Sequence, residues 1–276
     1  MTDLDWAAMA DVLELEGEAH RPYVQLALAE LAQLEPQRIM DIGSGPGVAA
    51  CQLAAAFPKA EVTAVDGTPE LLARAEQRAK RLGVELRTRV AEFPAGLDDL
   101  GTADLIWTAQ TVHHVGDQQD ALNRLARLLT PGGVLAVVEG GLPTRWLPHD
   151  LGFGRPGLQS RVDAAMSERF NQMRAELPGS VATVETWADM LRTAGLEGTR
   201  SKTFLVDRPA PLDDGTRRWL RGTAERYRHG LQDHLDAEDL ATLDRLLDPA
   251  DPMGLDQRPD LFLLTAKTVH FGHNPA

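Results

Sequence analysis

Apolar and polar residues follow one another along the first half of the chain in a pattern that predicts strands and helices in turn. Ile39, Met40 and Ile42 form the end of an apolar run typical of a buried parallel strand. A second apolar run, from Val48 to Phe57, is typical of a helix and is stopped by Pro58. A repeating order of strand and helix predicts an α/β fold with a parallel sheet.

The same pattern continues to about residue 140. Thr68-Pro69 is expected to begin a helix that ends at Gly83, and Asp117 is expected to cap another. Further strands are predicted over residues 61–66, 84–90, 103–108 and 134–138.

Two helices are predicted before the first strand, within an N-terminal segment of residues 1–36. Residues 3–16, which include Leu4, and residues 23–34 both carry apolar side chains at helical spacing. These helices form either a lid over a ligand or a cover for the edge of the sheet, and the sequence leaves both interpretations open.

Residues 37–140 are expected to hold the core of the fold, and residues 141–276 the remainder. A helix is predicted over residues 185–194, and strands are predicted near 199–206 and over 260–271. The last strand is apolar on both faces, which is typical of a strand in a sheet that is covered on both faces.

Two insertions, at about residues 141–180 and 208–259, interrupt this remainder and carry helical patterns. They are too short to be domains, so we interpret them as a helical cap at the carboxyl edge of the sheet, where open α/β folds bind ligands. Large apolar side chains in the cap either line a substrate pocket or pack the cap helices; these are Trp146, Phe153, Phe170, Met173, Trp219 and Tyr227.

The turn after the first strand has the sequence Asp41-Ile-Gly43-Ser-Gly45-Pro-Gly47. Glycines let a chain turn sharply, and we expect all three to let a ligand lie against bare backbone near helix N–H groups. A dinucleotide fingerprint would need glycine where Val48 stands, and a phosphate-binding loop would need Lys-Ser or Lys-Thr after the glycines. A carboxylate beside the turn suits a ligand with an ammonium group.

Acidic and histidine residues follow the next strands. Asp66 ends the predicted strand 61–66, 19 residues after Gly47, at a spacing typical of an acid that binds ribose hydroxyls; a helix-capping aspartate is the alternative. Glu92-Phe93 and then His113-His114 come after the third and fourth strands, and Leu-Leu-Thr-Pro-Gly-Gly precedes the fifth.

This succession of motifs over residues 38–140 resembles the class I S-adenosylmethionine-dependent methyltransferases. The resemblance implies a Rossmann-like seven-stranded sheet, with six parallel strands and an antiparallel seventh. It also implies that Glu92 reaches the adenine amino group and that Phe93 packs against the ring, unless both lie in a surface loop. The cofactor-binding residues it implies are Asp41, Gly43, Ser44, Gly45, Gly47, Asp66, Gly67, Glu92, Phe93, Ala109, Gln110 and His114.

His113 and His114 are the candidate catalytic residues, because in this family the loop after the fourth strand runs beside the reactive methyl group. Histidine can hold or release a proton near neutral pH, so either could act as a general base. The alternative is that one of the pair bonds the backbone and shapes the turn. His149 and Tyr227 are weaker candidates. Adjacent histidines without an acid or cysteine at ligand spacing do not predict a metal site.

Composition limits the class of substrate. The net charge of −13 disfavours nucleic acid and anionic membrane surfaces as partners. The acidic start is unlike a secretory or mitochondrial leader, and no apolar run has the length of a membrane span, so a cytoplasmic protein is expected. The single cysteine, Cys51, excludes an internal disulfide and is interpreted as a core residue.

The sequence therefore predicts transfer of a methyl group from S-adenosylmethionine to oxygen, nitrogen or carbon of a small molecule, such as a natural-product intermediate. A cofactor-binding regulatory or assembly protein without catalysis is the alternative. An NAD-dependent oxidoreductase is disfavoured by Val48. The oligomeric state is left open, and a homodimer is compatible with the sequence.

Overall fold

The computed structural model describes residues 5–276 and contains a seven-stranded sheet in the order β3-β2-β1-β4-β5-β7-β6. The strands β1 to β4 and β5 pair in parallel. β7 is the antiparallel strand: Asn274 near its end bonds Gly133 near the start of β5. The strands are β1 Arg38–Ile42, β2 Glu61–Asp66, β3 Arg87–Val90, β4 Ala103–Ala109, β5 Leu129–Arg145, β6 Glu197–Arg208 and β7 Leu263–His273. The predicted fold class is confirmed.

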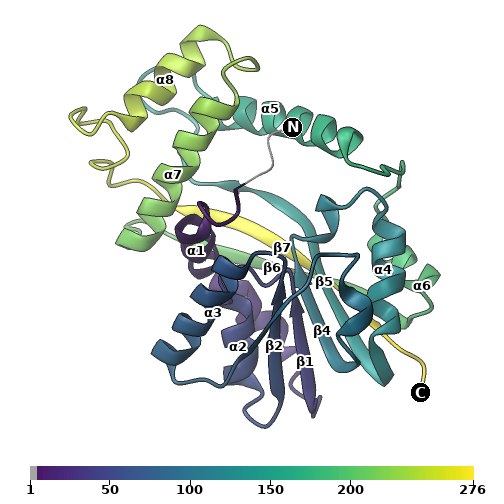
Figure 1. Cartoon of the computed structure of the whole chain (residues 1–276). Helices are drawn as coiled ribbons and strands as arrows, with labels where there is room; N and C mark the ends of the chain where they lie inside the picture. Colours follow the sequence, from purple (N-terminus) through teal and green to yellow (C-terminus); the bar gives the residue numbers. More distant parts are fainter. Residues whose placement is uncertain (1–4) are drawn as a thin grey trace. The chain divides into compact units, whose positions relative to one another are not determined.

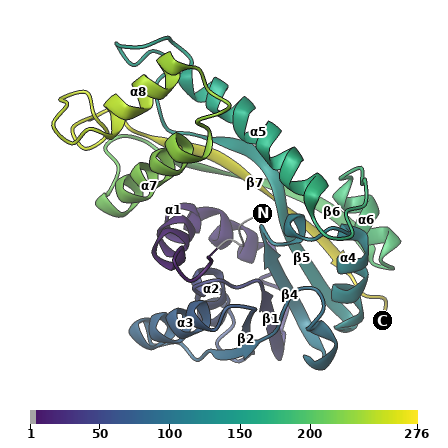
Figure 2. The same ribbon diagram turned by 45° about the horizontal axis from the view of Figure 1, so that its top comes forward.

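Helices join these strands as the sequence predicts. The helices are α1 Ala10–Ala29, α2 Val48–Ala56, α3 Pro69–Leu82, α4 Gln118–Arg127, α5 Leu158–Glu176, α6 Trp187–Thr193, α7 Asp214–Gly230 and α8 Ala237–Leu247. Short 3-10 turns lie at Leu97–Asp99 and Val112–His114. The helices α1, α2 and α3 lie on one side of the central strands, and α4 and α6 lie on the other (Figures 1 and 2). Gly83 ends α3 with a positive φ of 68°, and the Asp117 carboxylate caps α4 by accepting the N–H of Asp120.

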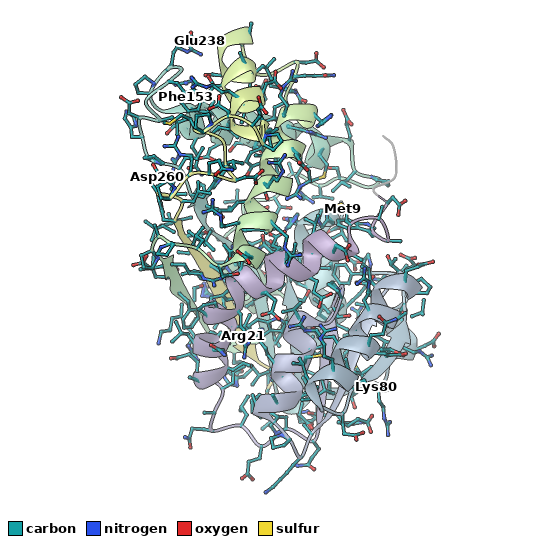
Figure 3. The ribbon with its side chains drawn as sticks, turned by 90° about the vertical axis from the view of Figure 1, so that its left-hand side faces the viewer. Met9, Arg21, Lys80, Phe153, Glu238 and Asp260 are labelled. Carbon is teal, nitrogen blue, oxygen red and sulfur yellow. The ribbon has the colours of Figure 1, made fainter. Side chains whose placement is uncertain are left out.

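The prediction of two N-terminal helices is wrong: α1 is one helix, and Pro22 lies inside it. Proline lacks an N–H group and costs one helical hydrogen bond. Buried side chains continue on both sides of it, from Ala19 to Leu28, so packing stabilises the helix across that point. Figure 3 shows α1 between the labelled residues Met9 and Arg21. Leu4 lies outside the described residues.

Several boundaries differ from those predicted: the strand expected over residues 260–271 is β7 Leu263–His273, and β3 and β5 differ as well. β3 begins at Arg87 and not at Val84, because the chain after Gly83 first forms a short irregular stretch. β5 is far longer than residues 134–138 and includes Thr130-Pro-Gly-Gly, whose Gly132 and Gly133 pair with Asn274. Pairing with β7 therefore extends β5 beyond its apolar run.

The chain divides into two compact units. The described part of the first comprises residues 5–141, 176–204 and 267–276, and the second comprises residues 142–175 and 205–266. In the second unit α7 packs on α8, and Arg161 of α5 makes two 2.7 Å bonds with the buried carboxylate of Asp239 in α8. The interpretation of the insertions as a cap stays a prediction.

Strand register brings the ends of the parallel strands to one edge. Ile42 lies opposite both Val65 and Thr108, and Ala109 lies opposite Val138. The residues that follow these positions share the carboxyl edge of the sheet, where α/β folds bind ligands. This edge contains the glycine turn, Asp66, the loop after β4 and the middle of β5.

Ion pairs hold α1 against α3. The guanidinium of Arg78, whose side chain is only 6% exposed, pairs with Glu14 at 2.8 Å and also with Glu18. Arg81 adds a 2.7 Å bond to Glu14. α1 also lies close to α2, because a Cβ atom at Gly17 would stand 2.8 Å from the Val48 side chain. Helix α1 is thus docked on both helices that adjoin it.

Replacing Arg78 by leucine should lower the free energy of unfolding by about 1–3 kcal/mol, because two partly buried carboxylates lose their partner. The matched control is Arg74→Leu, which removes the exposed pair with Asp11 and should cost at most about 1 kcal/mol. Urea denaturation measures both. Equal losses for the two variants would contradict the assignment of Arg78 as the main anchor of α1.

Candidate functional site

The three glycines after β1 have different surroundings. Gly43, Gly45 and Gly47 all have positive φ, at 72°, 53° and 74°. A Cβ atom at Gly43 would lie 2.3 Å from Oγ1 of Thr111, and one at Gly47 would lie 2.5 Å from Cβ of Ala75. A Cβ atom at Gly45 would meet nothing within 4 Å. Gly43 and Gly47 thus allow close packing within the protein, and Gly45 faces open space; the contacts of all three with the cofactor stay predictions.

Asp66 holds the turn in place. Its Oδ2 accepts the N–H of Gly45 at 2.9 Å, and its Oδ1 accepts the N–H of Thr68 at 2.9 Å, at the start of α3. The Thr68 side chain makes no capping bond, so the carboxylate of Asp66 is the side chain that accepts a main-chain N–H at that end of the helix. Asp66 therefore braces the open backbone at Gly45, and its role toward ribose stays a prediction.

Asp41 is a buried acid that accepts a backbone hydrogen bond from Ala50 but keeps one carboxylate oxygen without a partner among the described residues. Its side chain lies at the end of β1, the residue is 2% exposed, and Oδ2 has no hydrogen-bond partner among the described residues. Burial, and then the nearby charge of Asp66, raise the pKa of Asp41 to about 7. The hydroxyl of Ser44, in the turn itself, is likewise buried without a partner in the described part of the chain.

The residues predicted after β2 and β3 meet one another. A Cβ atom at Gly67 would lie 2.7 Å from Oε2 of Glu92, so that carboxylate lies against the bare backbone of Gly67. Phe93 is partly buried and packs against the core cluster that includes Val65 and Leu97. The adenine assignments of Glu92 and Phe93 stay predictions.

The loop after β4 is fixed at several points. Gln110 has a φ of 54°, which is rare outside glycine, and its main-chain N–H donates to the carbonyl of Val138 at 2.9 Å. The hydroxyl of Thr111, which lies against Gly43, donates to the carbonyl of Ala109 at 3.0 Å. The loop is therefore packed directly on the glycine turn.

Glu139 is the residue that the sequence analysis missed. It is 3% exposed and lies in β5. Its Oε1 accepts the N–H groups of Val112 at 2.9 Å and His113 at 3.3 Å, and its Oε2 lies 2.8 Å from Nδ1 of the His113 ring. An acid directly after the apolar run 134–138, at the carboxyl end of a predicted strand, was the available signal, and it is the same signal that identifies Asp66.

The Glu139 carboxylate decides the state of the His113 ring. A carboxylate accepts hydrogen bonds, so the contact places a ring hydrogen on Nδ1 and orients the imidazole. The His113 side chain is 16% exposed. An imidazole oriented by a buried acid is the arrangement of a general base.

His114 has a different environment. Its main-chain N–H donates to the carbonyl of Thr111 at 3.0 Å and closes the 3-10 turn. Its ring lies 5.3 Å from that of Trp6, edge to face, and 4.2 Å from that of His113. The two weaker candidates, His149 and Tyr227, belong to the second unit.

The aromatic residues of the second unit do not share one environment. Trp146 and Trp219 are buried, and the Arg245 guanidinium lies 4.2 Å from the ring centre of Phe153. Phe170 is exposed. Packing within the unit thus accounts for the two tryptophans and for Phe153.

The first unit fits the cofactor that the resemblance implies. S-adenosylmethionine joins a nucleoside to an amino acid and carries an ammonium and a sulfonium charge. The open backbone at Gly45 leaves room for such a molecule, and the buried carboxylate of Asp41, whose Oδ2 has no partner among the described residues, suits a cation. None of the residues predicted to bind the cofactor is a lysine or arginine that would repel it.

The remaining candidate features are a hollow away from the carboxyl edge of the sheet, possible metal sites and possible membrane spans. A hollow of about 730 Å³ lies at the opposite, amino-terminal edge of the sheet, where Gln37 precedes β1 and Ala60 precedes β2. Within residues 5–276 no three His, Cys, Asp or Glu side chains are grouped as a metal site would need. None of the helices in this described part combines the length and apolarity that crossing a membrane requires.

Comparison with known proteins gives three kinds of match. Residues 40–135 match the family model described as a methyltransferase domain. Trans-aconitate 2-methyltransferase of Methylobacterium nodulans is 30% identical over 96% of this chain and 99% of that protein. The enzyme of the same name from Streptomyces coelicolor is 30% identical over 83% of this chain and 72% of its own length.

Solved structures share the fold. A putative O-methyltransferase from Nostoc punctiforme has a TM-score of 0.53 and 21% identity, over 71% of this chain and 56% of that one. A phosphoethanolamine N-methyltransferase from Haemonchus contortus, solved with S-adenosylhomocysteine, has a TM-score of 0.51 and 16% identity, over 92% and 53%. The chain spans a little over half the length of each of these two proteins.

Replacing Gly45 by valine should abolish measurable binding of S-adenosylhomocysteine, because the side chain fills the open space and strains a positive φ. Gly47→Ala is the matched control: it forces α2 away from Ala75, and its main effect should be on stability. Calorimetric titration and thermal unfolding separate the two effects. Unchanged affinity in Gly45→Val would show that the ligand lies elsewhere.

Replacing Asp41 by asparagine should stabilise the ligand-free protein at pH 8. Because the folded-state pKa is raised, the folded protein keeps a proton that the unfolded chain releases, and stability falls as pH rises from about 4 to about 7. The variant lacks this loss, so its advantage should grow across that window to about 1–3 kcal/mol. Urea denaturation at pH 4.5 and pH 8 measures it, and an advantage equal at both pH values would contradict the assignment.

Proposed function

Since this chain belongs to the class I S-adenosylmethionine-dependent methyltransferases, we propose that His113 removes a proton from a small-molecule acceptor as the acceptor is methylated. The observation that carries the proposal is the 2.8 Å contact between Nδ1 of His113 and the buried carboxylate of Glu139. The acidic chain, with a net charge of −13, also favours a small organic acceptor over nucleic acid.

When bound, S-adenosylmethionine supplies a methyl group on a positively charged sulfur. The part left to the protein is to align the acceptor, take its proton and exclude water. His113 Nε2 receives the proton, and the charge that then forms on the ring is stabilised by the Glu139 carboxylate at Nδ1. Main-chain bonds from Val112 and His113 to the same carboxylate keep the ring from turning away.

The position of the loop supports this role for His113. Thr111, two residues earlier, packs on Gly43 of the glycine turn, and the carboxylate of Glu139 holds the loop from the other side. A base on this loop is therefore next to the turn whose open backbone suits the cofactor. The remaining cofactor assignments, Asp66, Gly67, Glu92, Phe93, Ala109, Gln110 and His114, belong to the same proposal.

A second acceptor chemistry is favoured by the relatives. Their name states that they methylate trans-aconitate, which is a carboxylic acid, and the similarity extends over almost the whole chain. A carboxylate is ionised at neutral pH and needs no base. In that case His113 orients the acceptor and removes no proton. Intermediates of natural-product biosynthesis that carry hydroxyl or amine groups belong to the first chemistry.

His113→Asn should lower kcat by about 10²- to 10⁴-fold, because the variant cannot take the proton. Glu139→Gln should lower it less, and the affinity for S-adenosylhomocysteine should stay within about twofold for both variants. Release of S-adenosylhomocysteine, measured with a panel of acceptors that includes trans-aconitate, reports the rate. His273→Asn, at the opposite edge of the sheet, is the matched control.

The pH dependence of kcat distinguishes the two chemistries. With a base, the wild-type rate rises with pH through one ionisation, and His113→Asn loses that rise. A rate that does not depend on pH, together with a loss below tenfold in His113→Asn, would instead assign the acceptor as a carboxylate. Tight binding of the cofactor with no turnover of any acceptor would favour a regulatory or assembly protein.

A further inference from the structure

Lys267 differs from every other lysine of the chain. Lys59, Lys80 and Lys202 are exposed, whereas Lys267 is half-buried near the start of β7. β7 runs antiparallel to β5, so its first residues lie toward the carboxyl edge of the sheet, where the glycine turn and His113 are. A lysine is thus held at the candidate site, on the strand that neighbours Glu139.

The ammonium group of Lys267 has no partner among the described residues. It makes no hydrogen bond or ion pair with them, and its nitrogen is not one of the polar atoms sealed inside the protein. Surrounding protein lowers the pKa of Lys267 by desolvation, which Glu16 and Glu139 oppose. An ammonium group partly removed from water is normally paired, so the lone ammonium of Lys267 calls for an explanation.

Neither neighbouring carboxylate supplies the missing partner. Glu139 already accepts three N–H groups, from Val112, from His113 and from the His113 ring, so its charge is compensated. Glu16 of α1 is near enough to act on Lys267 electrostatically, but the two do not form an ion pair. The positive charge therefore remains available at the site edge.

Tyr23 of α1 lies within electrostatic reach of the same two acids, Glu16 and Glu139. It is buried, and its hydroxyl makes no hydrogen bond with the described residues. Burial and the charges of Asp41, Glu16 and Glu139 raise the pKa of its phenol, so the hydroxyl stays a neutral donor. Tyr23 and Lys267 share Glu16 and Glu139 as neighbours. A neutral donor and a cation thus both lie within electrostatic reach of the acid that holds His113.

We propose that Lys267 binds a carboxylate of the methyl acceptor and makes the enzyme select acidic acceptors over neutral ones. An ammonium group pairs with a carboxylate through a charge-assisted hydrogen bond. The proposal rests on the proposed function, since it names the chemistry of the acceptor at the same site. The other carboxylate available there is that of the amino-acid part of the cofactor, and the experiment separates these two sources.

The test is calorimetric titration of the S-adenosylhomocysteine complex with a panel of small carboxylic acids, including trans-aconitate and its trimethyl ester. The wild-type complex should bind at least one acid and not the ester. Lys267→Met should weaken binding of that acid by at least about tenfold, while Lys267→Arg retains most of the affinity. Lys202→Met, which removes an exposed lysine of β6, should bind as the wild type does.

Titration with S-adenosylhomocysteine alone separates the two sources. Its dissociation constant should change by less than about twofold in Lys267→Met, and a larger loss would assign Lys267 to the cofactor and overturn the proposal. Absence of binding by every acid to the wild-type complex, or equal affinity in Lys267→Met, would overturn it as well. Thermal unfolding checks that each variant is folded, and Lys267→Gln, which also removes the charge, replaces Lys267→Met if that variant is not folded.

Failure of this proposal can be distinguished from failure of the proposed function. If the rate of methyl transfer is the same in Lys267→Met as in the wild type, the proposed function holds and the proposed role of Lys267 is wrong. Acid binding that depends on Lys267 without any methyl transfer leaves the binding site standing and removes the activity.

Discussion

The carboxylate of Glu139 is the group on which the candidate site depends. It accepts two main-chain N–H groups of the loop after β4 and the ring N–H of His113, so one buried acid sets both the path of the loop and the state of the ring. Strand β7 holds the main chain of the same residue, because His270 Nε2 lies 3.1 Å from the main-chain carbonyl oxygen of Glu139 and bonds it. The loop after β4, Glu139 of β5 and His270 of β7 thus all contribute to the candidate site, and no single loop determines it.

Acids at this edge cost stability and are useful to a cationic ligand. Asp41 is buried near Asp66, and both burial and that charge raise the pKa of Asp41. An apolar residue in its place would be cheaper for folding. The cost is explained if a positively charged ligand binds beside it, because that ligand then stabilises the ionised form. The backbone of Gln110 is a second local cost, since its φ is positive. The residue that follows it, Thr111, lies against Gly43 of the glycine turn.

The parts of the fold that depend on local pattern could be predicted from the sequence. The strand from Glu61 to Asp66, the helix from Val48 and the cap at Asp117 are where the pattern indicates, because periodicity and capping act over a few residues. The continuity of α1 could not be predicted, since it depends on tertiary packing on both sides of Pro22. The extent of β5 could not be predicted either, because pairing with β7, more than 120 residues away, determines it.

In the candidate site, too, local pattern identifies some residues and tertiary contacts decide the rest. The sequence identifies His113 and the glycine turn but cannot distinguish Gly45 from Gly43 and Gly47, because Thr111 and Ala75 reach the latter two only in the folded chain. Lys267, to which we assign an acceptor carboxylate, could not be proposed from the sequence, since an isolated lysine in an apolar strand carries no local signal.

The ion pairs of Arg78 favour the interpretation of helix α1 as a fixed cover and not as a moving lid. A lid must open at small cost, whereas Arg78 is almost fully buried between Glu14 and Glu18, and Gly17 lies in close contact with Val48. The same helix contributes Tyr23, next to the charges of Asp41, Glu16 and Glu139. If α1 shapes the proposed acceptor site, it must keep its position from one turnover to the next, and its anchoring to α3 would then serve the proposed selection of the acceptor as well as the stability of the fold.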